Sequence, residues 1–130
     1  MNKKEAQIFF KRRGLVKETL RVGDQEYTIK LKIFTNLEAD ALEEEFATVN
    51  EIDNSLSVDG SRLVEERLLR SILDAPFDCP VSDNEFIPWK DATEDQKRIA
   101  LRNLDPKIRE VILKRVSLMN SLDGQEVSFL

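Results

Sequence analysis

Apolar and polar residues alternate along residues 26–34, which is the pattern of a β-strand with one buried face and one solvent-exposed face. A second strand is predicted over 15–21, and the segment Val22-Gly23-Asp24-Gln25 between the two strands has the composition of a tight turn. We therefore expect a β-hairpin near the N-terminus. The apolar positions of its second strand are Tyr27, Ile29, Leu31 and Ile33.

Beyond the hairpin, apolar residues recur at the three- and four-residue spacing of amphipathic helices. Thr35 and Glu38 have the spacing of a capping box, in which each side chain accepts a hydrogen bond from the other residue's backbone N–H. They predict a helix over 37–49, and an apolar stripe that includes Leu69 predicts another over 61–73.

Two further helices are predicted near the C-terminus. Thr93 and Gln96 repeat the capping-box spacing, and Asp105-Pro106 places a good N-cap residue before a proline at the first helical position. The pattern as a whole predicts one α+β domain over 1–130, in which an N-terminal β-hairpin precedes a small bundle of about four helices.

Two segments lack periodicity. Residues 50–60 are rich in Asn, Asp, Ser and Gly and are interpreted as a flexible connection, and the prolines within 75–90 predict an irregular segment. Its large apolar residues are expected to pack back on the domain. They are Phe77, Cys79, Phe86 and Trp89.

Composition places the chain among globular proteins with a strongly charged surface, since 41% of its 130 residues are apolar and 35% are charged. Apolar runs are only a few residues long, and neither a membrane span nor a signal peptide is expected. Cys79 is the only cysteine, so an intrachain disulfide is excluded and a reducing compartment such as the cytoplasm is favoured.

Composition also excludes several kinds of active site. The chain contains no histidine, which rules out histidine-based triads and histidine-containing metal sites. Asp40 and Glu43-Glu44-Glu45 form the densest acidic cluster, but consecutive helix residues point in different directions, so a solvated face is expected rather than a cation site. We expect no catalytic residue, no cofactor and no bound metal.

Charge is unevenly distributed along the chain. Residues 1–34 carry nine Lys and Arg against four acidic residues, a balance of +5, although the whole chain carries −5. Residues 35–60 contain eight acidic residues and no Lys or Arg. The two regions are complementary in charge and predict pairing within one molecule or between copies, so a homo-oligomer stays open.

Both ends of the chain have features of partner-binding extensions, namely a basic arm over 1–14 and an apolar tail over 121–130. A nucleic-acid contact by the arm is disfavoured by the sequence pI of about 4.9, and an acidic protein surface is favoured. The residues predicted to bind partners lie in the arm, the acidic cluster and the tail. They are Phe9, Phe10, Lys11, Arg12, Arg13, Glu43, Glu44, Val127, Phe129 and Leu130.

The order of elements resembles a family of viral assembly factors. A basic leader, a β-hairpin, an acidic helix opening at Phe34-Thr35-Asn36-Leu37-Glu38 and a helical remainder are similar to the small tail assembly chaperones of tailed bacteriophages and to related baseplate-hub assembly proteins. Residue-level likeness covers 20–49 and 61–74. The resemblance implies a cytoplasmic factor that binds the tape-measure protein through apolar edges of the 37–49 and 61–73 helices.

Other functions remain open beside this one. A structural subunit of a virion tail or baseplate would use the same arm and tail to reach its neighbours, and would be found in the particle rather than in the host cytoplasm. A small regulatory inhibitor or antitoxin would bind a single partner tightly. An enzyme is the least favoured class.

Overall fold

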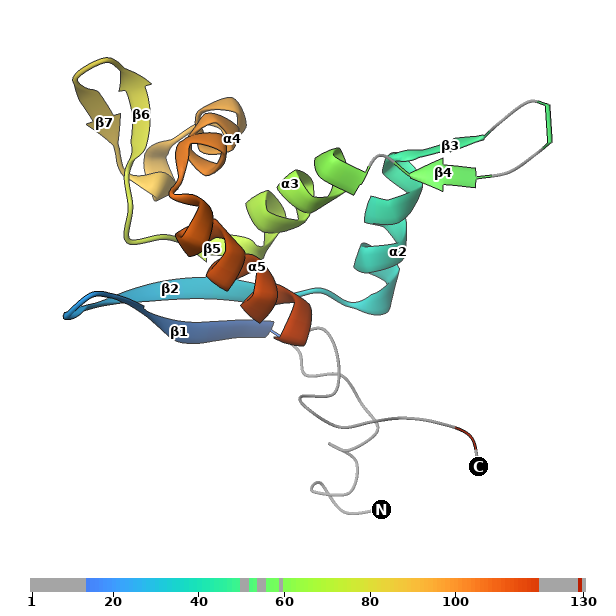
Figure 1. Cartoon of the computed structure of the whole chain (residues 1–130), viewed down its shortest axis with the longest axis horizontal. Coiled ribbons are helices and arrows are strands. Elements are labelled where there is room, and N and C mark those ends of the chain that lie inside the picture. The colour runs from blue at the N-terminus through green and yellow to red at the C-terminus, as the bar shows by residue number, and fades with distance from the viewer. Residues whose placement is uncertain (1–13, 50–51, 54–55, 59, 120–128, 130) are drawn as a thin grey trace.

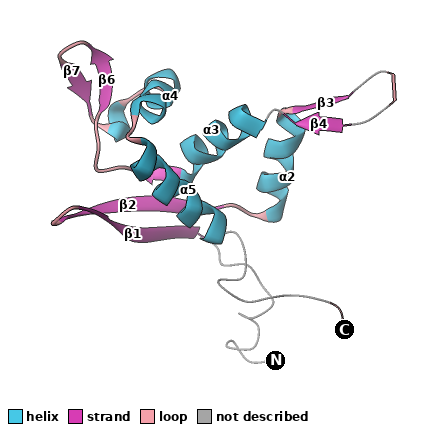
Figure 2. Ribbon diagram, in the orientation of Figure 1, coloured by secondary structure: helices cyan, strands magenta, loops and turns pink. Residues whose placement is uncertain are grey.

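The computed structural model describes residues 14–49, 52–53, 56–58, 60–119 and 129. These residues confirm the predicted α+β fold with its N-terminal hairpin, and they include four α-helices (Figure 2). The described strands form a three-stranded sheet in the order β1-β2-β5 and two separate two-stranded sheets.

Strands β1 (Gly14–Val22) and β2 (Gln25–Ile33) form the predicted hairpin. They pair antiparallel along their whole length, and Val22 lies opposite Gln25 beside a two-residue turn. The turn begins at Gly23, whose φ of 61° lies in the left-handed region that glycine enters without steric cost. Two-residue turns of this kind match the twist of the flanking strands and so fix their register.

One face of this sheet carries the apolar side chains and is covered by helices. Ile29, Leu31 and Ile33 are buried there. Helices α5 (Pro106–Met119) and α3 (Gly60–Ser71) contact β2 from this side, and the opposite side of the sheet carries no described helix (Figure 1). The main core that results also contains Leu68, Leu69, Ile72, Cys79, Trp89, Ala100, Leu101, Ile112, Val116 and Met119.

A third strand follows α3 without a loop and corrects one prediction. The helix predicted over 61–73 ends at Ser71, and the next three residues form β5 (Ile72–Asp74). Ile72 lies opposite Leu31 on β2, so this β-branched residue completes the sheet instead of extending the apolar stripe of the helix. The indole N–H of Trp89 donates to the Ile72 carbonyl at 3.3 Å and holds this strand from the core side.

Helix α2 (Asn36–Glu45) begins at the predicted capping box. The backbone N–H of Glu38 donates to Thr35 Oγ1, and the backbone N–H of Thr35 donates to Glu38 Oε1. The helix packs near α3, where Phe34, Leu42 and Phe46 form a second, smaller apolar cluster.

The C-terminal part of the helix predicted over 37–49 is wrong, because α2 ends at Glu45. Ala47–Val49 forms β3, which pairs antiparallel with β4 (Leu56–Val58). The segment 50–60, interpreted as a flexible connection, therefore contains a strand. The β-branched pair Thr48-Val49 favours extended backbone over helix, which the apolar spacing of Val49 concealed.

The segment predicted to be irregular over 75–90 contains another hairpin, made by β6 (Cys79–Ser82) and β7 (Glu85–Ile87), and then the short 3₁₀ helix η1 (Trp89–Asp91). Prolines limit this hairpin to very short strands, which is why no alternation was visible. It projects from the end of the molecule away from β3 and β4 (Figure 1).

Large apolar residues of the 75–90 segment divide into two groups. Cys79 and Trp89 are fully buried, and the Phe77 ring meets the Trp89 ring edge to face at 5.7 Å between centroids. Phe86 is 63% exposed on β7, so the prediction that it packs back on the domain is wrong. Among the described strands, β7 pairs only with β6.

Helices α4 (Glu94–Asn103) and α5 confirm the predicted C-terminal pair. Thr93 and Gln96 form both hydrogen bonds of the capping box at α4, and Asp105 Oδ1 accepts from the Lys107 backbone N–H at the start of α5. Both helices contribute to the main core, α4 with Ala100 and Leu101 and α5 with Ile112, Val116 and Met119.

The position of Leu68 in the core predicts a large stability loss on truncation. Leu68→Ala should lower the free energy of unfolding by about 2–5 kcal/mol, because the side chain is almost fully buried between α3 and the sheet. Leu37→Ala is the matched control, since Leu37 is 80% exposed on α2. Urea denaturation followed by circular dichroism measures both; similar losses in the two variants would contradict the core assignment.

Candidate protein-binding surface

The solvent-exposed face of the β1–β2 hairpin is basic, although the chain as a whole is acidic. Alternation along the two strands places four cations on this outer face, against Glu26 as the acidic residue of the same two strands there. We call it the basic sheet face. Its residues on the two strands are Leu15, Lys17, Thr19, Arg21, Glu26, Thr28, Lys30 and Lys32.

Two of these cations have acidic partners. Arg21 donates to Glu26 across the hairpin at 2.7 Å, and both side chains are well exposed. Lys32 pairs with Glu38 at the start of α2. The hydrogen bond from Lys32, assisted by the one from the Thr35 backbone, lowers the pKa of the Glu38 carboxyl below its usual value.

The other two cations, Lys17 and Lys30, lie directly opposite each other. Neither forms an ion pair with a described residue, even though Asp74 is the nearest β5 residue to Lys30 in the strand register. Like charges directly opposite each other destabilise a sheet. The Lys17–Lys30 pair places this destabilising repulsion at the centre of the basic sheet face.

Strand β1 is an edge strand of the three-stranded sheet, and no described strand pairs with its outer side. In a hairpin closed by a two-residue turn, hydrogen-bonded and non-hydrogen-bonded pairs alternate from the hydrogen-bonded pair that flanks the turn. Val22 and Gln25 are that flanking pair. The backbone N–H and C=O groups of Leu15, Lys17, Thr19 and Arg21 therefore point away from β2, along an open edge nine residues long.

The edge strand is tied to the body of the protein from its inner face. Arg115 of α5 donates through Nε and Nη2 to Glu18 Oε1 at 3.0 and 2.7 Å. This ion pair thus connects two residues that are 97 positions apart in the sequence. The ion pair holds β1 beneath α5 and so limits the movement of the open edge relative to the rest of the protein.

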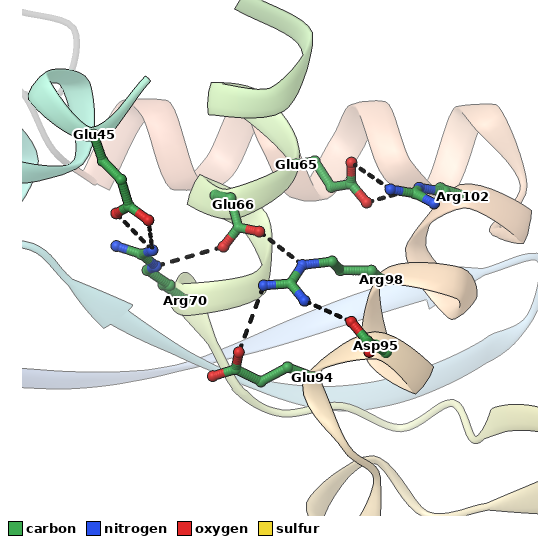
Figure 3. Close-up of polar contacts among 8 residues, drawn as sticks. All are labelled: Glu45, Glu65, Glu66, Arg70, Glu94, Asp95, Arg98 and Arg102. Carbon is green, nitrogen blue, oxygen red and sulfur yellow. Dashed lines mark hydrogen bonds and ion pairs between the residues drawn. The ribbon is translucent and has the colours of Figure 1, made fainter. Parts of the chain in front are cut away.

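A separate network of ion pairs joins α2, α3 and α4 (Figure 3). Arg70 bridges Glu45 and Glu66, and Glu66 also accepts from Arg98 Nε at 2.7 Å. Arg98 continues to Glu94 and Asp95, and its hydrogen bond to Glu66 raises the pKa of the guanidinium. Every charge in the chain of contacts has an opposite partner, so the network is a connection between helices rather than a ligand site.

An open hollow of about 470 Å³ lies between α3, α4 and α5. Its charged lining is balanced, because Glu65 and Glu110 are matched by Arg102 and Arg109. Arg102 is also paired with Glu65 at 2.8 Å. The lining therefore selects neither an anion nor a cation.

Metal-binding side chains and the single cysteine were the remaining candidates for a chemical site in the described part of the chain. No three acidic or cysteine residues there are grouped to hold a metal ion. The Cys79 thiol is fully buried, and this burial raises its pKa, which keeps it protonated and unreactive. None of the described helices is long and apolar enough to cross a membrane.

Most residues predicted to bind partners lie outside the described part of the chain. This applies to the arm residues from Phe9 to Arg13, to Val127 and to Leu130. Phe129 is described and fully exposed. Glu43 and Glu44 are exposed on the last turn of α2, away from the basic sheet face.

Sequence reasoning missed the basic sheet face as a candidate site, although the signal was present. The alternation that predicts the buried face of β2 also places Lys30 and Lys32 together on the opposite face. The turn at Gly23 then determines which β1 residues lie beside them.

The ion-pair network predicts a measurable contribution of Glu66 to stability. Glu66→Gln should lower the free energy of unfolding by about 1–3 kcal/mol, because the charge shared by Arg70 and Arg98 is removed from a nearly buried position. Glu26→Gln is the control in an exposed pair and should cost less than about 1 kcal/mol. Denaturant titrations measure the free energy of unfolding of both variants. Equal losses would contradict the structural role assigned to Glu66.

Comparison of the chain with protein-family models, with curated proteins and with solved structures found no match.

Proposed function

We propose that this protein is a non-catalytic binding factor for other proteins, and that it takes up a partner at the open edge of β1. The observation that carries the proposal is the outer side of the nine-residue strand β1, with which no described strand pairs. The strand is held by its partner β2 and by the Arg115–Glu18 ion pair. An extended segment of another protein adds to such an edge by backbone hydrogen bonds.

The dimensions of the edge support this mode of binding. Every second residue of β1 points its backbone outward, and each of these residues offers one N–H donor and one C=O acceptor. They are Leu15, Lys17, Thr19 and Arg21. Natural proteins usually shorten or cover strands of this kind, because an exposed edge pairs with other chains. Among the described elements β1 and β2 are the longest strands, and β1 has an open side.

A more specific role follows from the resemblance to phage tail assembly chaperones. In this version the partner is the tape-measure protein or another tail or baseplate protein, and binding takes place in the cytoplasm of the host cell. A structural subunit of a virion tail is the alternative, and an inhibitor or antitoxin is a second one. All three roles use a protein-binding surface.

We place that surface on a different part of the protein from the one that the resemblance implies. The resemblance assigned binding to apolar edges of the helices over 37–49 and 61–73. Leu42 and Phe46 are buried in the protein's own second cluster, and Leu68 and Leu69 in its main core. Since these side chains are used internally, we assign the interaction to the sheet instead.

Thr19→Pro is the substitution that tests the proposed edge. The backbone N–H of Thr19 points away from β2, so proline removes an outward donor without removing a hydrogen bond of the hairpin. We expect the variant to fold and to lose binding by at least about tenfold, the equivalent of one to two backbone hydrogen bonds.

Thr19→Val is the matched control, because it changes the same side chain and keeps the N–H. The tagged wild-type chain and both variants are compared by quantitative mass spectrometry of the proteins recovered from the native host or infected cells. A partner retained by Thr19→Val and lost by Thr19→Pro supports the proposal. Equal recovery with Thr19→Pro, with unchanged circular dichroism, contradicts it.

A further inference from the structure

The basic sheet face indicates the chemistry of the strand that fits beside β1. Lys17 and Lys30 form a non-hydrogen-bonded pair, in which opposite Cα atoms approach to about 4.5 Å and side chains come closest. Neither lysine forms an ion pair with a described acidic residue. A carboxylate placed on the open side of Lys17 would relieve their mutual repulsion.

The same charges disfavour a second copy of β1 as the occupant of the edge. Two β1 strands paired edge to edge would place Lys17 and Arg21 of each copy on one shared face, beside both copies of Lys30. Lysine on an edge strand prevents such pairing between identical proteins. Charge repulsion therefore disfavours pairing of β1 with another copy of itself, and charge attraction favours pairing with an acidic segment.

On the inner face, β1 lies beside the Glu18–Arg115 ion pair and beside several apolar residues. A hollow of about 140 Å³ lies between the hairpin and α5, and Leu20, Ile29, Val111 and Ile112 are among its lining residues. Val111 is about half exposed there, although it belongs to the helix that covers the sheet. A strand added to β1 would bring every second side chain to this side of the sheet.

We propose that the β1 edge binds an extended segment of another protein in which acidic residues alternate with apolar ones. The acidic residues face Lys17 and Arg21, which are four residues apart on the same face, and the apolar residues lie toward Val111 on the inner face. This assignment rests on the proposed function, since it specifies the partner of the same edge.

Synthetic peptides added to the full-length protein test the proposal. The probe is a capped heptapeptide of alternating valine and glutamate, and its matched control carries lysine at each glutamate position. Binding is followed by ¹H–¹⁵N NMR at low salt, with the backbone amides of Leu15, Lys17, Thr19 and Arg21 as reporters. We expect the glutamate peptide to shift these amides and to bind at least about tenfold more tightly than the lysine peptide, as two exposed ion pairs allow.

Substitutions in the protein locate the charge effect. Lys17→Gln should reduce the preference for the glutamate peptide several-fold, whereas Lys114→Gln, which removes an exposed cation of α5, should leave it unchanged. Raising the salt concentration should also reduce the preference, because the ion pairs are exposed to solvent.

The outcomes separate this inference from the proposed function. Equal binding of the two peptides at the edge amides would overturn the acidic assignment and leave strand addition intact. No shift of these amides with either peptide would overturn both. Tighter binding of a ten-residue oligothymidylate than of the glutamate peptide, through the same lysines, would overturn the inference in favour of a nucleic-acid surface.

Discussion

Burial of one face of the β1–β2 hairpin beneath α5 and α3 is the interaction on which the other features depend. Ile29, Leu31 and Ile33 supply the sheet side of this contact, and the period of two along a strand then sends every intervening side chain to the opposite face. The basic sheet face is therefore a direct consequence of the core. The strand positions of its cations are set because the apolar residues beside them are packed in the core.

This arrangement explains how a small acidic protein presents a basic surface. Residues 35–130 carry a balance of −10 and residues 1–34 a balance of +5, and the hairpin places its cations on its outer side. The ion-pair network around Glu66 and Arg98 neutralises charge between the helices at the same time. Lys17 and Lys30, which form no ion pair with a described residue, lie next to the edge that offers free backbone groups.

Local sequence signals were sufficient to predict the elements with strong periodicity or helix caps. They were insufficient where pairing with a distant segment determines whether a residue lies in a helix or a strand. The hairpin, both capping boxes and the helix after Asp105 follow from adjacent residues. Ile72 and Val49 have helical spacing to the residues before them, yet each lies in a strand that pairs with another segment of the chain. The site was harder to predict, because an open edge depends on which strands do not pair.

Hydrogen exchange of the β1 backbone amides in the free protein is the measurement that tests the open edge most directly. The account predicts an alternation, with slow exchange at Val16, Glu18 and Leu20, whose N–H groups bond to β2, and fast exchange at Leu15, Lys17, Thr19 and Arg21. Uniformly slow exchange along the strand would contradict it, since it would mean that the outer side of β1 is already occupied.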